Sequence, residues 1–366
     1  MYNVKLESPV FGLYTIDNYL IICSGGGNKK FGVKNKILLY NLSPYGLSSK
    51  PLFEKIIDDS IPTFITGIND KQIFVTSMNG AAYFYKISSN KFEEIYTLDV
   101  LEEYNNNEEI FLSCIHINNK TGEMVTGTSN GILSYFRITY KYNNNVNTID
   151  SINIVSKNDK AHLRAINNLT IVKIGKNNLV ITASGDGNCK VFDLNNELRY
   201  ISKFSFRQFE GETANYYMRD ILYDNFNIYT LQSPIQGKSF ITKWSLKNIN
   251  QVAPIETIEV SNNVCFSMNF NKNKNLIGII DSEGNILFVN PYNMNLIGKK
   301  KVVENMIKSG IFWEKYFIIG SIDNTVSMNT VKSNFSFFGF LRILFILFCI
   351  VFVSYDIYIK TKNKLN

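Results

Sequence analysis

Residues 25–35 are the part of the sequence whose residue types best suit binding of a ligand or partner, because Gly25, Gly26 and Gly27 are consecutive and a polar stretch follows. Adjacent glycines adopt backbone conformations that other residues resist, and they leave amides and carbonyls open to a ligand. A phosphate-binding loop is excluded, since the Gly-x-x-x-x-Gly-Lys-Ser/Thr spacing is missing and no helical pattern follows. Two interpretations remain: a functional loop on a rigid scaffold, or a flexible and dispensable hairpin insertion.

The remaining reactive residue types give no sign of an enzyme. The chain has two histidines, His116 and His162, and no cluster of acidic or histidine residues of the kind expected at the channel mouth of a hydrolase. Asp186, Asp281 and Asp323 fall in predicted turns, where we interpret them as hairpin formers. The sequence therefore predicts neither covalent chemistry nor a small-molecule substrate.

The five cysteines predict buried free thiols. Each lies in an apolar stretch, they are far apart, and none forms a Cys-x-x-Cys pair, so neither a zinc framework nor a disulfide framework is indicated. They are Cys23, Cys114, Cys189, Cys265 and Cys349. This usage is typical of a reducing compartment.

Composition and charge favour a folded protein that does not bind nucleic acid. The chain is 45% hydrophobic and 14% aromatic, which is enough apolar material for a core. The net charge of +7 comes from lysines scattered among asparagines, without a run of basic residues that would follow a phosphate backbone.

A repeated pattern of strands runs through most of the chain. Seven apolar segments that end in small residues recur at intervals of roughly 40–55 residues, which is the period of a four-stranded propeller blade. They are residues 20–24, 73–77, 124–128, 180–184, 228–231, 276–280 and 317–321. The sequence therefore predicts an all-β, seven-bladed β-propeller, with these segments as the second strand of each blade.

Turns rich in Gly, Asp and Asn follow most of these strands, as two-residue hairpins require. Third strands are predicted at residues 81–87, 132–138, 189–194 and 286–290. Residues 162–194 resemble a WD repeat, with His162 near the start, Asp186 in the turn, and Phe192 and Asp193 where Trp-Asp usually stands. That resemblance implies a structural role for His162, and Trp244 takes the equivalent place in the fifth blade.

The two ends of the propeller region predict its closure. The seventh blade shows three strands, ending near Val331, while residues 3–7 form a short strand without a local partner. Pairing these two parts of the chain would complete the seventh blade and remove its open edge.

Residues 335–355 predict a single transmembrane helix. They are apolar except for Arg342, and at about 1.5 Å per residue they span the roughly 30 Å hydrocarbon core. A mid-bilayer arginine costs about 2.5–3.5 kcal/mol, which the many Leu, Ile and Phe residues outweigh. The lysines that follow favour a cytosolic tail, but the start of the chain has no secretory signal pattern to export the propeller. We therefore expect residues 1–332 as a cytosolic propeller, the helix, and residues 356–366 as a short luminal tail.

Residues 8–42 carry a family resemblance. Three stretches are similar to the first blade of the endoplasmic-reticulum guanine-nucleotide exchange factors for Sar-type GTPases. They are Ser8-Pro-Val-Phe-Gly-Leu, the aliphatic strand before the three glycines, and Gly-Val-Lys-Asn-Lys at residues 32–36. This is the family of the Sec-twelve protein and prolactin regulatory element-binding protein. Its members combine a seven-bladed propeller with one C-terminal membrane helix, so the resemblance in layout covers the whole chain.

The resemblance implies roles for the glycine-rich loop. In that family the loop binds a potassium ion, largely through backbone oxygens, and presses on the GTPase. Here Val33 and Asn35 would promote exchange, Val33 by contacting the partner and Asn35 by fixing the loop exit. The rest of the partner-binding loop would be Gly25, Gly26, Gly27, Asn28, Lys29, Lys30, Gly32 and Lys34. Potassium ligands would come from Gly25, Gly26 and Asn35, although the chain has three glycines where many members have four.

The expected function is therefore nucleotide exchange on a Sar-type small GTPase at the endoplasmic-reticulum membrane, which starts assembly of the COPII vesicle coat. The propeller would face the cytosol. An exchange factor accelerates nucleotide release by binding the empty GTPase better than the loaded one. The alternative is a membrane-anchored propeller scaffold that binds coat or tethering proteins without exchange activity.

Overall fold

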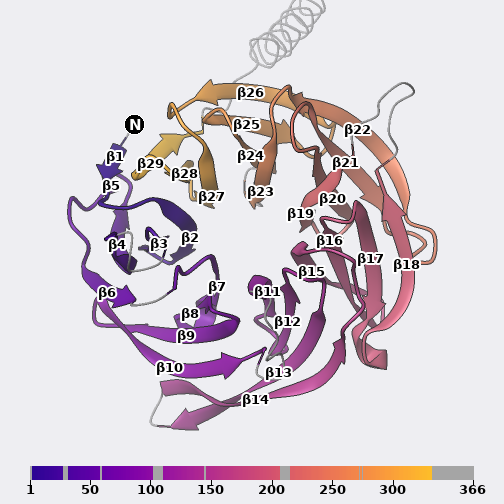
Figure 1. Cartoon of the computed structure of the whole chain (residues 1–366), viewed down its shortest axis with the longest axis horizontal. Coiled ribbons are helices and arrows are strands. Elements are labelled where there is room, and N and C mark those ends of the chain that lie inside the picture. Colours follow the sequence, from indigo (N-terminus) through magenta and orange to yellow (C-terminus); the bar gives the residue numbers. More distant parts are fainter. Residues whose placement is uncertain are drawn as a thin grey trace, which may run out of the picture. The chain divides into compact units, whose positions relative to one another are not determined.

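Seven antiparallel sheets follow one another around a central axis, and each forms one blade of a propeller (Figure 1). The computed structural model describes residues 2–27, 32–57, 60–101, 110–143, 146–206, 215–271, 273 and 275–331. The predicted all-β, seven-bladed architecture is thereby confirmed. The predicted membrane helix at 335–355 and the tail at 356–366 lie outside the described residues, and no helix within the described ranges is long and apolar enough to cross a membrane.

Each blade begins with the strand nearest the axis, and these inner strands contact one another around the ring. They are β2 (Val10–Ile16), β7 (Phe64–Ile68), β11 (Leu112–Asn118), β15 (Ile166–Ile174), β19 (Tyr217–Tyr223), β23 (Cys265–Asn271) and β27 (Ile307–Trp313). In all of them except β7, the register with the second strand slips near the start of the strand. Such β-bulges bend a strand and redirect its side chains.

The second strands lie where the repeat predicts them, in all seven blades. They are β3 (Tyr19–Ser24), β8 (Ile73–Met78), β12 (Glu123–Thr128), β16 (Asn177–Ser184), β20 (Asn227–Ser233), β24 (Leu276–Asp281) and β28 (Tyr316–Ser321). These strands are almost entirely buried, because each is covered by neighbouring strands within its blade and by the two adjacent blades. That explains why they read as continuous apolar runs instead of an alternating pattern.

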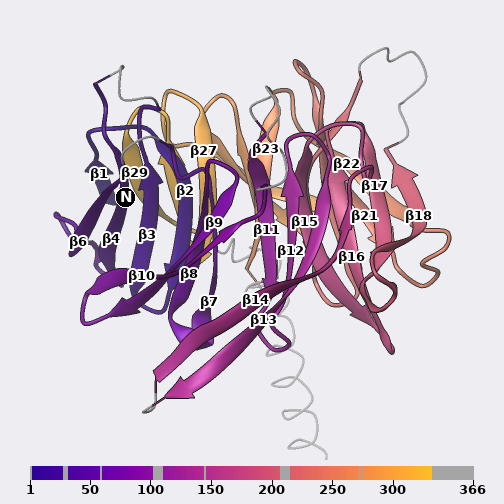
Figure 2. The same ribbon diagram turned by 60° about the horizontal axis from the view of Figure 1, so that its bottom comes forward.

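The third and outer strands complete the blades. The third strands are β4 (Asn35–Ser43), β9 (Ala81–Ser88), β13 (Leu133–Asn143), β17 (Asn188–Asp193), β21 (Ser239–Ser245), β25 (Asn285–Asn290) and β29 (Thr325–Thr330). The outer strands of the first six blades are β6 (Phe53–Ile57), β10 (Lys91–Asp99), β14 (Val146–Asn158), β18 (Arg199–Ser205), β22 (Ala253–Ser261) and β26 (Asn295–Lys301), with a short β5 (Gly46–Leu47) beside β4. Two 3-10 turns, η2 (Asn69–Lys71) and η3 (Leu194–Asn196), follow strand ends. The β13–β14 hairpin projects beyond the other strands (Figure 2).

The hairpins between second and third strands use the predicted turn residues. Asn79, Gly80, Gly187, Gly284 and Asn324 all have positive φ, which Gly and Asn tolerate. The aspartates in these turns also act as expected: the Asp281 carboxylate accepts hydrogen bonds from the backbone amides two and four residues later. These contacts confirm that the aspartates form hairpins.

The propeller closes through its N-terminus, as predicted. β1 (Tyr2–Lys5) pairs antiparallel with β29 as the outer strand of the seventh blade. Val4 lies opposite Val326 and packs on the apolar cluster shared by blades one and seven. β1 begins one residue and ends two residues before the predicted strand at 3–7. Its pairing leaves β29, the third strand of the seventh blade, paired on both sides.

The core consists of apolar layers between neighbouring blades. Six clusters join blades one to two, two to three, three to four, four to five, five to six, and seven to one. At the junction of blades six and seven, Phe288, Phe312 and Phe317 pack ring against ring. Each blade is therefore held on both faces, which gives a rigid frame for loops at its two ends.

Candidate functional site

The candidate site is the glycine loop, which we define as residues 25–34 between β3 and β4 of the first blade. The structure describes residues 25–27 and 32–34 of it. Asn28, Lys29 and Lys30, which we predicted to bind the partner, lie outside the described residues. The other blades carry short hairpins at the equivalent place, so the loop is an insertion at the same end of the propeller.

The side chain of Asn35 holds the two limbs of the glycine loop together. Its Oδ1 atom accepts hydrogen bonds from the backbone amides of Gly26 and Gly27, each 3.1 Å long, and its Nδ2 atom donates to the Gly27 carbonyl at 2.8 Å. Asn35 is 1% exposed and is the first residue of β4. The prediction that Asn35 fixes the loop has a geometric basis, while its role in exchange stays a prediction.

Close packing explains the glycines at the start of the loop. A Cβ atom on Gly25 would lie 2.1 Å from Oδ1 of Asn35, and one on Gly26 would lie 2.3 Å from Cβ of Val33. Gly27 and Gly32 have φ of 94° and 70°, which other residues rarely adopt. The loop is therefore built around Asn35, with glycines where any side chain would collide or strain the backbone.

Val33 and Lys34 differ in what they offer a partner. Val33 is partly buried because its side chain covers Gly26, whereas Gly32 and Lys34 are exposed. A partner would meet the partly buried Val33 and the exposed Lys34. The structure thus places the predicted residues Val33 and Asn35 on the same limb, with Val33 at the surface and Asn35 beneath it.

Charged contacts hold the base of the glycine loop. Lys36 Nζ lies 2.8 Å from the Glu7 carboxylate and 3.0 Å from that of Glu54. The hydrogen bond to Glu7 is the main reason why the pKa of Lys36 is raised. The amide of Gly25 also donates to the Pro9 carbonyl at 3.0 Å. Lys36 is therefore occupied within the chain.

The potassium ligands predicted from the family resemblance fit only in part. Asn35 Oδ1 already accepts two hydrogen bonds, so its side chain suits a structural role better than ion coordination. The hydroxyl of Ser24, next to Gly25, is buried without a hydrogen-bond partner among the described residues. An ion at this place would be held by that hydroxyl and the carbonyls of Gly25 and Gly26, and it would supply a fixed positive charge. Potassium binding remains a prediction.

His162 has the structural role expected from the WD-like pattern. Its Nδ1 lies 2.9 Å from the Asp186 carboxylate and its Nε2 lies 2.7 Å from the Thr182 hydroxyl. Burial opposes ionisation of Asp186, but the hydrogen bond from His162 and those from the amides of Asn188 and Leu163 outweigh it, so the pKa of Asp186 is well below its ordinary value. The network ties a turn to its neighbouring strands, and the hydrogen-bonding atoms of the buried His162 ring are both used within it.

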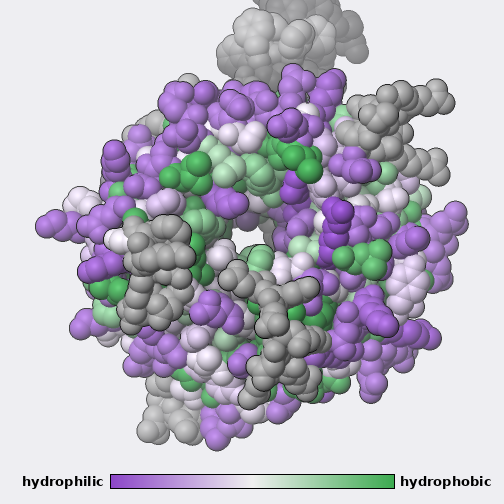
Figure 3. Space-filling model, viewed as in Figure 1, coloured by the Kyte–Doolittle hydropathy of each residue, from purple (hydrophilic) through white to green (hydrophobic). Residues whose placement is uncertain are grey.

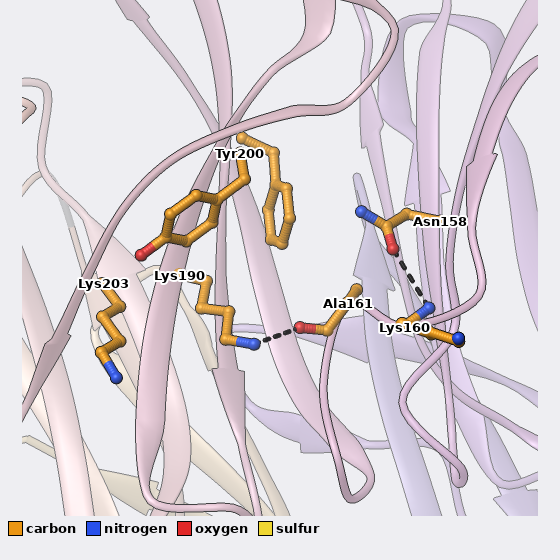
Figure 4. Close-up of a pocket in the computed structure, with 7 residues that line it drawn as sticks. Asn158, Lys160, Ala161, Lys190, Tyr200 and Lys203 are labelled. Atoms are coloured by element: carbon orange, nitrogen blue, oxygen red, sulfur yellow. Dashed lines mark hydrogen bonds between the residues drawn. The ribbon is translucent and has the colours of Figure 1, made fainter.

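Sequence reasoning missed a basic hollow at the outer edge between blades three and four. It has a volume of about 360 Å³, and Lys160, Lys190 and Lys203 line it together with Tyr200 (Figure 4). Lys190 Nζ donates to the Ala161 carbonyl at 2.6 Å, so one ammonium group is already bound. The lysines come from separate segments, and no sequence spacing would have linked them.

Comparison with solved structures identifies the architecture. Sqt1 of Saccharomyces cerevisiae superposes with a TM-score of 0.61 at 12% identity, covering 91% of this chain and 87% of Sqt1. Raptor of Chaetomium thermophilum gives a TM-score of 0.66 at 11% identity over 90% of this chain, which corresponds to 29% of Raptor. Both similarities support a WD-like propeller and, at these identities, show the fold alone.

The sequence comparisons add no relative. No family model matches the chain, and no curated protein matches it. In contrast, 1643 chains of solved structures match the fold, so this similarity does not select a function. The function has to be argued from the site.

Proposed function

We propose that this chain is a guanine-nucleotide exchange factor for a Sar-type small GTPase and that it acts through the glycine loop. The observation that carries the proposal is the set of hydrogen bonds between Asn35 and the backbone of Gly26 and Gly27, which ties the described start of the insertion to its exit on a rigid blade. A dispensable hairpin insertion would need no buried side chain dedicated to its form. The resemblance of residues 8–42 to Sar-type exchange factors supplies the partner.

The proposed mechanism breaks no covalent bond. The factor binds the nucleotide-free GTPase more tightly than the loaded form, and this difference in affinity accelerates release of GDP. Asn35 fixes Gly26 and Gly27 before contact, so less conformational entropy is lost at these residues on docking. Val33 presents an apolar surface to the partner, and Lys34 presents a charge to acidic groups beside it.

The proposal includes a place in the cell. Residues 335–355 would anchor the chain in the endoplasmic-reticulum membrane, with the propeller in the cytosol, so that activated GTPase forms where the COPII coat assembles. This part rests on the apolar sequence and the family resemblance. An anchor also raises the local concentration of the factor relative to a membrane-bound partner.

Asn35→Ala and Val33→Asp test the mechanism in a GDP-release assay with a Sar-type GTPase and fluorescent GDP. We expect both changes to leave the melting temperature nearly unchanged and to slow exchange at least tenfold. Asn35→Ala unties the loop, while Val33→Asp puts a charge into the docking surface. Assays in potassium and in sodium separate an effect of the ion from an effect of the loop.

Matched controls for these variants are available on β14, away from the loop. Asn153→Ala and Val155→Asp make the same chemical changes at exposed positions of the third blade and should exchange at the wild-type rate. Wild-type exchange by both loop variants would remove the glycine loop from the mechanism. Stoichiometric GTPase binding without faster GDP release would instead support the alternative, a propeller scaffold.

A further inference from the structure

A half-buried arginine lies on the end of the propeller that carries the glycine loop, several blades away from it. Arg219 is the bulged residue of β19, and its guanidinium lies 4.9 Å from the ring centre of Tyr217. Arg164 lies over the same ring at 5.9 Å. Neither arginine forms an ion pair among the described residues. Two uncompensated guanidinium groups on one ring indicate a site for an anionic group.

The backbone around Arg219 is held in place from the neighbouring blade. Asn167 donates to the Met218 carbonyl at 2.7 Å, and Asn168 donates to the Asp220 carboxylate. The same carboxylate accepts the backbone amide of Met268, in the blade on the other side, at 2.6 Å. Residues on both sides of Arg219 are thus fixed across three blades, so the position of the arginine is determined before any ligand arrives.

The guanidinium of Arg219 keeps unused hydrogen-bonding capacity. One Nη atom donates to the Pro234 carbonyl at 3.1 Å, whereas the Nε atom is buried without a partner among the described residues. Burial lowers the pKa of Arg219, but an arginine stays charged at any physiological pH. An unpaired buried donor on a permanent cation costs free energy that an acceptor would recover.

Arg219 opens into a hollow of about 340 Å³ between blades five and six, formed by the β20–β21 turn and the β22–β23 connection. The lining residues described include the amides of Gln236, Asn262 and Asn263 and no acidic side chain. Lys308 is outside this lining, but its Nζ lies 5.7 Å from the ring centre of Phe266, which is part of the lining. A hollow lined by amide donors and a cation, without an acidic side chain, favours binding of a carboxylate group.

Apolar side chains frame this hollow. Ile235, in the β20–β21 turn, is 72% exposed, and Phe266 and Val264 lie in the wall. A second hollow of about 460 Å³ is lined by Arg164 and Tyr217 and by Leu163, which is 91% exposed. Figure 3 shows that hydrophobic groups gather around the central opening of the face in view, within a hydrophilic rim. Apolar contacts next to a cation are typical of peptide recognition.

We infer that this surface binds an acidic peptide segment of a partner protein. A Glu or Asp side chain of the peptide pairs with Arg219, an adjacent aliphatic residue packs on Ile235 and Phe266, and a second acidic residue meets Arg164. Asp186 also lines the second hollow, but its carboxylate is occupied by His162 and two backbone amides. Nucleic acid is disfavoured because a phosphate backbone needs a longer row of cations than these few.

The basic hollow of Figure 4 is the weaker candidate for such a role. An ammonium group lacks the planar fork with which a guanidinium recognises a carboxylate, and that of Lys190 is already bound to a carbonyl. No exposed aliphatic side chain lies beside them in the lining. It therefore serves as the control surface: Lys203→Gln removes one positive charge there, as Arg164→Gln and Arg219→Gln do at the proposed site.

The test is fluorescence anisotropy of the full chain in detergent with a fluorescein-labelled peptide, Gly-Ser-Glu-Leu-Glu-Ser-Gly. We expect a Kd of about 100 µM at low salt, a range typical of short peptides. Arg219→Gln should weaken binding at least tenfold and Arg164→Gln at least threefold. Ile235→Ser should weaken it at least threefold, which a site for free anions would not show. Lys203→Gln should change it less than twofold.

Several outcomes would overturn the inference. The twin peptide Gly-Ser-Gln-Leu-Gln-Ser-Gly binding within twofold of the acidic one would show that charge is not read. Tighter binding of a single-stranded oligothymidine, sensitive to Arg219→Gln, would assign the surface to nucleic acid. Arg164 is exposed, so Arg164→Gln should fold like the wild type. If Arg219→Gln is unstable, Arg164→Gln still tests the inference, and unchanged peptide binding by Arg164→Gln would contradict it. None of these outcomes bears on the glycine loop, which is assayed separately.

Discussion

Asn35 and Asp220 are both buried, polar and engaged with several backbone amides, yet they do different work. Asn35 is neutral and organises one loop within its own blade. Asp220 accepts hydrogen bonds from Asn168, from its neighbour Ile221 and from Met268, and so connects blades four, five and six. A neutral amide suits a site that must stay constant with pH, whereas a buried carboxylate makes its contacts dependent on protonation.

Burial raises the pKa of Asp220 to about 6, and the hydrogen bonds from Met268, Asn168 and Ile221 offset burial only in part. The folded state therefore binds this proton more tightly than the unfolded state, and the contribution of Asp220 to the free energy of unfolding falls as the pH rises from about 4 to about 6. Against Asp220→Asn, we expect the wild type to gain about 2 kcal/mol on going from pH 7 to pH 4.5.

Urea unfolding of both proteins at the two pH values measures this difference. Asp70→Asn, at an exposed position of η2, is the control and should show no such change. A pH-independent difference between the wild type and Asp220→Asn would show that Asp220 ionises in the folded protein as it does in the unfolded chain.

At the residue scale, the sequence predicted contacts that are local along the chain. The turn aspartates were predicted from the composition of the turns, and the structural role of His162 beside Asp186 from the resemblance of residues 162–194 to a WD repeat. Blades four and five each contain only part of the hydrogen-bond network of a WD repeat. Blade four has Phe192 in place of the usual tryptophan. Blade five has Trp244, whose Nε1 donates to the Thr230 hydroxyl at 2.6 Å. The roles of Arg219 and Asp220 could not be predicted, because they depend on a bulge and on strands about fifty residues away in sequence.

At the scale of elements, the second strands were predictable because burial on every side makes them continuous apolar runs ending in small residues. The lengths of the outer strands were not, since those strands are half exposed and their composition is constrained less. The hairpin of β13 and β14 is the clearest case, with 11 and 13 residues. The predicted closure by β1 is confirmed. It was predictable because an unpaired strand edge exposes backbone groups that can pair with another chain, so the N-terminal strand was expected to cover the edge of the seventh blade.

Deleting residues 1–8 should lower the melting temperature by at least about 5 °C. The deletion removes the four residue pairs between β1 and β29, the packing of Val4 and the ion pair of Glu7 with Lys36. A loss of a few kcal/mol corresponds to a shift of this size in a domain of this length. Differential scanning calorimetry measures it.

An N-terminal Gly-Ser extension that leaves β1 intact is the matched control for the deletion and should melt as the wild type does. Exposure of the β29 edge should also increase aggregation on heating, because the freed strand can pair with another chain. An unchanged melting curve after the deletion would mean that the inter-blade layers alone hold the ring closed.

At the scale of the whole molecule, the glycine loop and the Arg219 hollow occupy the same end of the propeller. Both lie at turns between second and third strands, which repeat on one face around the ring. β29, a third strand, runs away from that face and ends on the opposite one. A rigid ring can therefore present two binding surfaces on one face, separated by blades, without any conformational change between them.

Residues 1–331 expressed alone should fold and melt within about 2 °C of the full chain, because the compact unit that ends at Thr330 contains every inter-blade layer and both strands of the closure. The membrane prediction is tested with the same pair of proteins. After reconstitution with phosphatidylcholine vesicles, the full chain should float with lipid on a density gradient and residues 1–331 should stay below. If both proteins float, lipid binding lies in the propeller. If neither floats, residues 335–355 are not a membrane anchor, because an exposed apolar stretch of that length partitions into hydrocarbon.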